Sequence, residues 1–243
     1  MIQLMKKRMF PEEMEVLYDR PFTPESLAED FEVKGGEWYV DEEGWLIGAN
    51  RENSAAMVMS KGEYFGDVLV EFDAATVLPA TRDINVTWHG SWDEELNRRD
   101  VAYVAGIQGW WQGMVGFEKS PKYDLLCQTK LFDFEPGKVY HMTVGNIGSD
   151  LFVVIDGVVA LEINDPDPID FEKYGRIGLE AYCTKVKYSN LKVKRVTWEN
   201  TAKPYDPEFE NNIRHRNRCR IVYFTSTCCN TGFARSFSGL GLG

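Results

Sequence analysis

Two short stretches of the chain concentrate aromatic side chains beside groups that can exchange hydrogen bonds. The first stretch reads NVTWHGSWDEEL, and the second reads GIQGWWQGMVGFEKSPKY. Flat aromatic rings stack on the apolar face of a pyranose, while amide and ammonium groups bond its hydroxyls. We therefore predict a carbohydrate-binding site made of the residues Trp88, Trp92, Gln108, Trp110, Trp111, Gln112 and Lys119.

The same stretches contain three residues that are suited to proton transfer. His89 is a histidine, the residue type most often used as an acid or base, and Glu118 and Asp93 are carboxylates that could act as its partner. If the protein cleaves a glycoside, we expect His89 with Glu118 or Asp93 to form the acid–base pair. The groove should run over the strands that carry Trp88 and residues 114–118. The loop from Ser91 to Asp100 should overhang it.

A structural reading of the same tryptophans is the alternative hypothesis. Tryptophan in a β-sandwich usually belongs to the core, and neighbours on one strand, such as Trp110 and Trp111, point to opposite faces. On this reading the protein is a non-catalytic structural or interaction sandwich without a sugar site. The two hypotheses differ in whether these tryptophans line an open groove, and the question of enzymatic activity stays open.

The pattern around these stretches is that of β-strands. LFVVIDGVVALEI joins two β-branched runs at Asp156-Gly157, a pair that accepts the positive φ angles of a type I′ hairpin turn. GRIGLEAY and VKYSNLKVKRV follow, and VLVEFDAAT upstream alternates apolar and polar residues. The chain should therefore be all-β, with two antiparallel sheets packed as a jelly-roll sandwich.

We expect three segments in the 243 residues. Residues 1–15 should be an N-terminal lead-in, and residues 16–199 should form the jelly-roll domain. The strand pattern then stops, and arginine and glycine become frequent, so residues 200–243 should be a weakly ordered C-terminal extension.

The order of these segments resembles the concanavalin A-like lectin/glucanase jelly roll. It is similar in particular to the small bacterial 3-keto-disaccharide hydrolase-like domain of unknown function and to YesU-like proteins. Two strands carry the likeness, one with Gly175, Ile177, Gly178 and Leu179 and one with Asn190, Leu191 and Val193. The resemblance implies carbohydrate contact on the concave face of a sheet, and the keto-sugar relatives imply cleavage assisted by an acidic proton beside the keto group. The glucanase pattern E-x-D-x-(x)-E is incomplete, because no second glutamate follows Glu71 and Asp73.

Composition narrows the partners and the location. The net charge of −11 argues against nucleic acid and anionic membranes, whereas a neutral saccharide remains compatible with it. Pro11, Glu12 and Glu13 interrupt the place where a signal peptide would be apolar, so we expect a cytoplasmic protein. The 5 cysteines form neither a disulfide framework nor a zinc motif, and we expect no cofactor or metal. Calcium is the alternative, at the acidic residues Asp165, Asp167 and Asp170.

Overall fold

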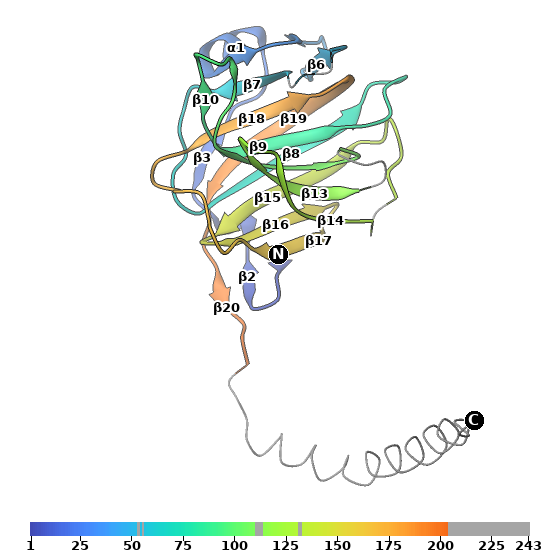
Figure 1. Ribbon diagram of the computed structural model, residues 1–243. Helices are drawn as coiled ribbons and strands as arrows, with labels where there is room; N and C mark the ends of the chain where they lie inside the picture. Colours follow the sequence, from blue (N-terminus) through green and yellow to red (C-terminus); the bar gives the residue numbers. More distant parts are fainter. Residues whose placement is uncertain (53, 55, 110–113, 131–132, 204–243) are drawn as a thin grey trace, which may run out of the picture. The chain divides into compact units, whose positions relative to one another are not determined.

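Two antiparallel β-sheets stack face to face to form the body of the protein (Figure 1). The computed structural model describes residues 1–52, 54, 56–109, 114–130 and 133–203. Within this part of the chain, residues Met1–Thr201 make up one compact unit. The predicted fold class, an all-β sandwich of two antiparallel sheets, is confirmed.

The first sheet has seven strands, and it carries most of the segments that we expected to bind a ligand. In spatial order its strands are β14 (Asp124–Thr129), β13 (Val115–Ser120), β12 (Ala102–Ile107), β9 (Ile84–Gly90), β18 (Arg176–Ala181), β7 (Ala56–Ser60) and β4 (Phe31–Lys34).

The second sheet has eight strands and holds the predicted Asp156-Gly157 hairpin. Its spatial order is β17 (Val158–Asn164), β16 (Asp150–Ile155), β15 (Tyr140–Ile147), β8 (Val68–Thr76), β19 (Thr184–Arg195), β6 (Leu46–Asn50) and β5 (Glu37–Val40), and β3 (Val16–Asp19) also pairs with β19. Asp156 and Gly157 have φ angles of 49° and 81°, as a type I′ turn requires.

Smaller elements complete the described chain. β10 (Trp92–Asp93) and β11 (Arg98–Arg99) form a two-stranded hairpin, and β1 (Ile2–Gln3), β2 (Lys7–Met9) and β20 (Glu199–Asn200) form a three-stranded sheet. The helices are the 3-10 helix η1 (Pro11–Glu13) and the helix α1 (Pro24–Asp30). In α1, Thr23 accepts a hydrogen bond from the backbone N–H of Ser26, and the Ser26 hydroxyl accepts one from the backbone N–H of Thr23.

The core lies between the two large sheets because each strand alternates its side chains between two faces. On β8, Val70, Phe72 and Ala74 are buried in this core, while Glu71 and Asp73 point to the other side. On β9, Val86 and Trp88 belong to the same core. Thr87, which alternates with Val86 and Trp88, lies on the outer face of the seven-stranded sheet with Glu180 of β18.

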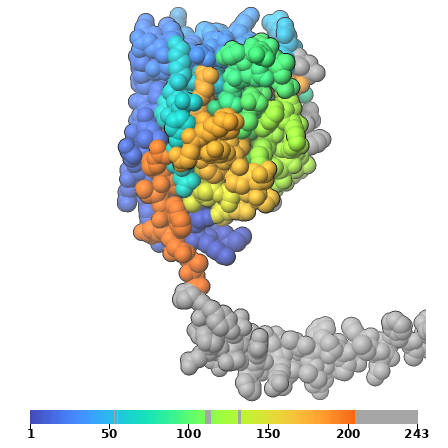
Figure 2. Space-filling view, turned by 60° about the vertical axis from the view of Figure 1, so that its left-hand side comes forward, coloured from blue at the N-terminus to red at the C-terminus, as the bar shows by residue number. Residues whose placement is uncertain are grey.

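Residues 1–15 are packed onto the sandwich. Ile2, Leu4, Met9 and Met14 are buried in a second apolar cluster with Phe152 of β16. Figure 2 shows the N-terminal residues, in dark blue, beside the orange end of the described chain, where β2 pairs with β20. The expected boundary at residue 15 thus falls inside the compact unit. No helix among the described residues is long and apolar enough to cross a membrane.

Candidate functional site

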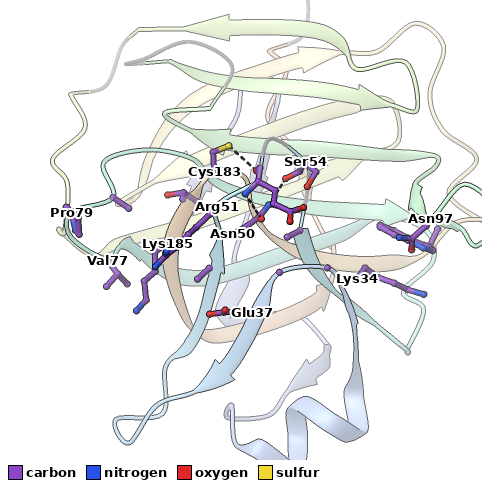
Figure 3. Close-up of a pocket in the computed structure, with 18 residues that line it drawn as sticks. Lys34, Glu37, Asn50, Arg51, Ser54, Val77, Pro79, Asn97, Cys183 and Lys185 are labelled. Carbon is purple, nitrogen blue, oxygen red and sulfur yellow. Dashed lines mark hydrogen bonds between the residues drawn. The ribbon is translucent and has the colours of Figure 1, made fainter.

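An open hollow of about 920 Å³ lies at one end of the sandwich (Figure 3). This volume falls in the usual range of small-molecule sites. The hollow is bounded by the β4–β5 and β6–β7 connections, the β8–β9 loop, the β18–β19 turn and the β10–β11 hairpin. Its polar and charged lining residues are Lys34, Glu37, Asn50, Arg51, Glu52, Ser54, Asn97, Thr184 and Lys185.

Trp92 is the aromatic side chain of this lining. The indole is partly exposed, and the Nζ atom of Lys34 lies 5.4 Å from the centre of its ring. Lys34 is held there by Glu94, 2.7 Å from Nζ, and by Glu32 at 3.2 Å. Burial acts against the ammonium charge, but these two carboxylates raise the pKa of Lys34 above its ordinary value.

Short hydrogen bonds connect other segments that line the hollow. The side-chain amide of Asn50 donates to the Ser54 carbonyl at 2.6 Å, and Cys183 Sγ lies 3.0 Å from the Glu52 carbonyl (Figure 3). Thr184 Oγ1 donates to the Arg82 carbonyl at 2.6 Å, which ties the β18–β19 turn to the β8–β9 loop. These bonds connect the β6–β7 and β8–β9 segments with the β18–β19 turn.

A buried ionic cluster joins the hairpin to the outer face of the seven-stranded sheet. Arg99 donates from Nη2 to Glu118 of β13 at 2.7 Å, from Nε to Ser120 at 2.8 Å, and from Nη1 to Glu180 of β18. Thr87 also donates to Glu180. Burial opposes the guanidinium charge, but Glu180 and Glu118 hold the pKa of Arg99 above its usual value. The hairpin is thus bonded across this face of the sheet.

Asp83 and Asn85 lie beside this cluster with two unsatisfied acceptor atoms. Asn85 Nδ2 donates to Asp83 Oδ1 at 2.9 Å, whereas Asp83 Oδ2 and Asn85 Oδ1 are buried without a hydrogen-bond partner. Burial, together with the charge of Glu180, raises the pKa of Asp83 to about 7, although the bond from Asn85 lowers it. Buried groups with shifted pKa values concentrate at functional sites.

Trp88 does not contribute to a ligand site, and this prediction is wrong. Its side chain is fully buried in the core, with its ring centre 5.4 Å from that of Tyr103 and 6.0 Å from that of Phe117. A ring enclosed by the two sheets cannot stack on a carbohydrate, so the structural reading holds for this residue.

His89 lies inside the sandwich as well, away from both of its predicted partners. Its ring nitrogens are 2.9 Å from the carbonyl oxygen of Tyr174 and 2.9 Å from Oδ1 of Asn146, on the eight-stranded sheet. Glu118 is adjacent to the core residue Phe117 and therefore points to the opposite face of its sheet. Asp93 Oδ1 accepts the backbone N–H groups at the tip of the hairpin. The predicted acid–base pair is not assembled.

Lys119 and Gln108 are also placed apart from the hollow. The Lys119 ammonium is 3.1 Å from Asp165, whose carboxylate also accepts from Tyr103 at 2.6 Å. Lys119 therefore contacts the acidic loop that we considered as an alternative calcium site. No group of three or more His, Cys, Asp or Glu residues suited to a metal occurs in the described ranges. The backbone N–H of Gln108 donates to Met114 just after β12.

Three predicted contact residues, Trp110, Trp111 and Gln112, lie outside the described residues, and so does most of the expected extension, at 204–243. Among the described residues that we predicted to bind the ligand, Trp92 lines the hollow, and Asn97 of the 91–100 loop lines it as well. The hollow itself lies on the side of β4 and of the loops after β6, β8 and β18, and not over Trp88 and β13.

The sequence reading missed Arg99, Glu180 and Asp83. Arg99 and Glu180 are 81 residues apart, so no local spacing indicated that they would meet. Asp83 carried only a weak signal, as a polar residue immediately before the buried strand β9.

Comparison with known proteins supports the fold and leaves the family open. No protein-family model and no curated protein matches the chain. Among solved structures, the carbohydrate binding module CBM66 from Bacillus subtilis aligns with a TM-score of 0.56 at 17% identity, covering 68% of this chain and 96% of the module. A protein of unknown function with a galectin-like fold from Bacillus subtilis aligns with a TM-score of 0.59 at 14% identity, covering 79% of this chain and 99% of that one.

A Bacillus licheniformis β-glucanase has a TM-score of 0.50 at 9% identity and covers 75% of this chain and 98% of its own. At such identities the likeness concerns the backbone arrangement. Together with the strand order described above, these neighbours show that the chain has the concanavalin A-like lectin/glucanase jelly-roll fold.

Proposed function

We propose that this protein binds a carbohydrate in the hollow beside the β10–β11 hairpin, with Trp92 as the stacking residue. The observation that carries the proposal is that Trp92 and a set of hydrogen-bonding side chains share one open hollow. Aromatic rings beside amide, carboxylate and ammonium groups match the alternating apolar and hydroxyl surfaces of a sugar. Two of the structural neighbours are named as a carbohydrate binding module and a β-glucanase, which favours this ligand class.

The polar atoms around Trp92 support the same ligand. Its indole Nε1–H is buried and has no acceptor in the described part of the chain. Because Nε1 is enclosed, a ligand in the hollow would contact the exposed part of the indole ring and not this N–H. Asn97 and Lys34 lie at the same side of the hollow, while Lys185, Val77 and Pro79 lie at the other (Figure 3).

We propose binding and not cleavage. The three residues expected to transfer protons lie at separate places: His89 between the sheets, Glu118 in the Arg99 cluster and Asp93 at the hairpin tip. None of the three is part of the lining of the hollow.

A glycan array followed by calorimetry on the best oligosaccharide tests the proposal. Trp92→Ala should weaken binding by roughly 1–3 kcal/mol, the loss expected for one aromatic anchor, without unfolding the domain. Trp198→Ala is the matched control, because Trp198 is 44% exposed and lies outside the hollow. If no glycan binds the wild type, or if Trp92→Ala binds as well as the wild type, the proposal fails and the structural alternative is favoured.

A further inference from the structure

The β10–β11 hairpin continues the antiparallel pair of β9 and β12: the backbone N–H of Ser91 donates to the Val101 carbonyl at 2.8 Å, and that of Asp100 donates to the Ser91 carbonyl at 3.0 Å. Each strand has two residues, paired as Trp92 with Arg99 and Asp93 with Arg98. Isolated two-stranded ladders are marginally stable even when they are longer. Leu96 near the tip is 60% exposed, so the tip is not anchored by apolar burial. These backbone bonds fix the base of the hairpin, and the position of the part that carries Trp92 depends in addition on side chains that tie it to the sheet.

Two ionic attachments connect the hairpin to the seven-stranded sheet, and they differ in strength. Glu94 pairs with Lys34, but its side chain is 71% exposed, and exposed pairs contribute roughly 0–1 kcal/mol. Arg99 is 4% exposed and bonds Glu118 and Glu180, which are 7% and 3% exposed. Removing one partner of a buried ionic group leaves the other charges uncompensated. The Arg99 attachment is therefore the dominant one.

Arg99 and Trp92 are direct cross-strand partners, so fixing one backbone position fixes the other. We infer that Arg99 is a positioning residue for the hollow: its bonds to Glu118, Glu180 and Ser120 hold the hairpin so that Trp92 stays in the wall. Arg99 itself is not part of that wall. The inference rests on the proposed function for its binding measurement, while the anchoring can be measured without a ligand.

The first test is amide hydrogen exchange on the full chain. Arg99→Met alone removes the guanidinium that compensates two buried carboxylates and endangers the fold, so the main variant combines it with Glu118→Gln and Glu180→Gln. Exchange in residues 91–100 should accelerate by about tenfold or more, while β8 and β15 keep their protection. Glu94→Gln, which removes only the exposed attachment, is the matched control and should change exchange much less. Unchanged protection of residues 91–100 in the triple variant overturns the inference.

The second test is a double-mutant cycle for oligosaccharide binding. If Arg99 acts through Trp92, the triple variant should lose affinity by a factor close to that of Trp92→Ala. It should cause no further loss in the Trp92→Ala background. Additive losses would show that Arg99 does not act through Trp92. If the wild type binds no saccharide, the proposed function fails, and the exchange measurement alone decides on the anchoring.

Discussion

His89 of the seven-stranded sheet and Asn146 of the eight-stranded sheet meet across the interior, with Nε2 2.9 Å from Oδ1. Asn146 in turn donates to Asp67 at 3.2 Å, and the ring of Phe171 packs 4.7 Å from the imidazole. A polar bridge between two sheets replaces apolar contacts at this point of the core. It couples the packing of the sandwich to the protonation of one side chain.

The first prediction concerns acid sensitivity. Burial lowers the pKa of His89, although its bonds to Asn146 and Tyr174 act in the opposite direction. The ordinary pKa of histidine is about 6.5. Below this pH the unfolded chain therefore binds more protons than the native state. Stability should fall as the pH drops from about 6.5 towards the lower native pKa. Denaturant midpoints at several pH values will measure it.

His89→Gln should remove this part of the pH dependence, whereas His141→Gln should keep it. His141 is the matched control, because it lies half exposed on the eight-stranded sheet and bonds Asp73 at 2.7 Å. A wild-type profile that His89→Gln leaves unchanged would contradict the assignment.

The second prediction has the opposite sign. The pKa of Asp83 is about 7 in the folded protein, mainly because of burial, against ~3.9 in an unfolded chain. The native state thus binds more protons between these values, and its stability falls as the pH rises from about 4 through 7. Asp83→Asn should stabilise the protein at about pH 8 by roughly 2–4 kcal/mol and have little effect near pH 4. A variant that is less stable at high pH would show that the Asp83 carboxylate is needed for folding.

The third prediction separates the core tryptophan from the ligand tryptophan. Trp88 is fully buried, so Trp88→Ala should cost about 3–5 kcal/mol of unfolding free energy, measured by urea denaturation. Trp88→Phe should cost less and should bind saccharide like the wild type. If Trp88→Phe weakened saccharide binding without lowering the free energy of unfolding, Trp88 would have to be part of the binding site.

Local signals explain which parts of the fold were predictable. The Asp156-Gly157 turn depends on two adjacent residues, and the alternation of β8 depends on nine, so both could be read directly. Trp88 and His89 broke the alternation. His89 has a φ of 47°, and the pairing of β9 with β18 shifts register there, so two consecutive side chains both enter the interior. A one-residue irregularity of this kind leaves no periodic signal.

The candidate site was less predictable because it is assembled from distant segments. The hairpin was expected to overhang the sheet, and Trp92 was among the expected contacts. The rest of the hollow comes from the turns around Gly36, Asn50, Pro79 and Cys183, whose meeting depends on strand order alone. The Arg99 cluster likewise joins the β10–β11 hairpin to β13 and β18. Its polar side chains lie far apart in the sequence.

The central claim is that a carbohydrate contacts Trp92 in the hollow, and the indole N–H signals of ¹⁵N-labelled protein test it directly. The Trp92 signal is assigned from its loss in Trp92→Phe, and those of Trp88 and Trp198 in the same way. During titration with the best oligosaccharide, the Trp92 signal should shift, because its ring lines the hollow and a bound ligand changes the surroundings of the indole. The signals of buried Trp88 and of distant Trp198 should stay in place. A saccharide that shifts other signals and leaves Trp92 unmoved would contradict the account.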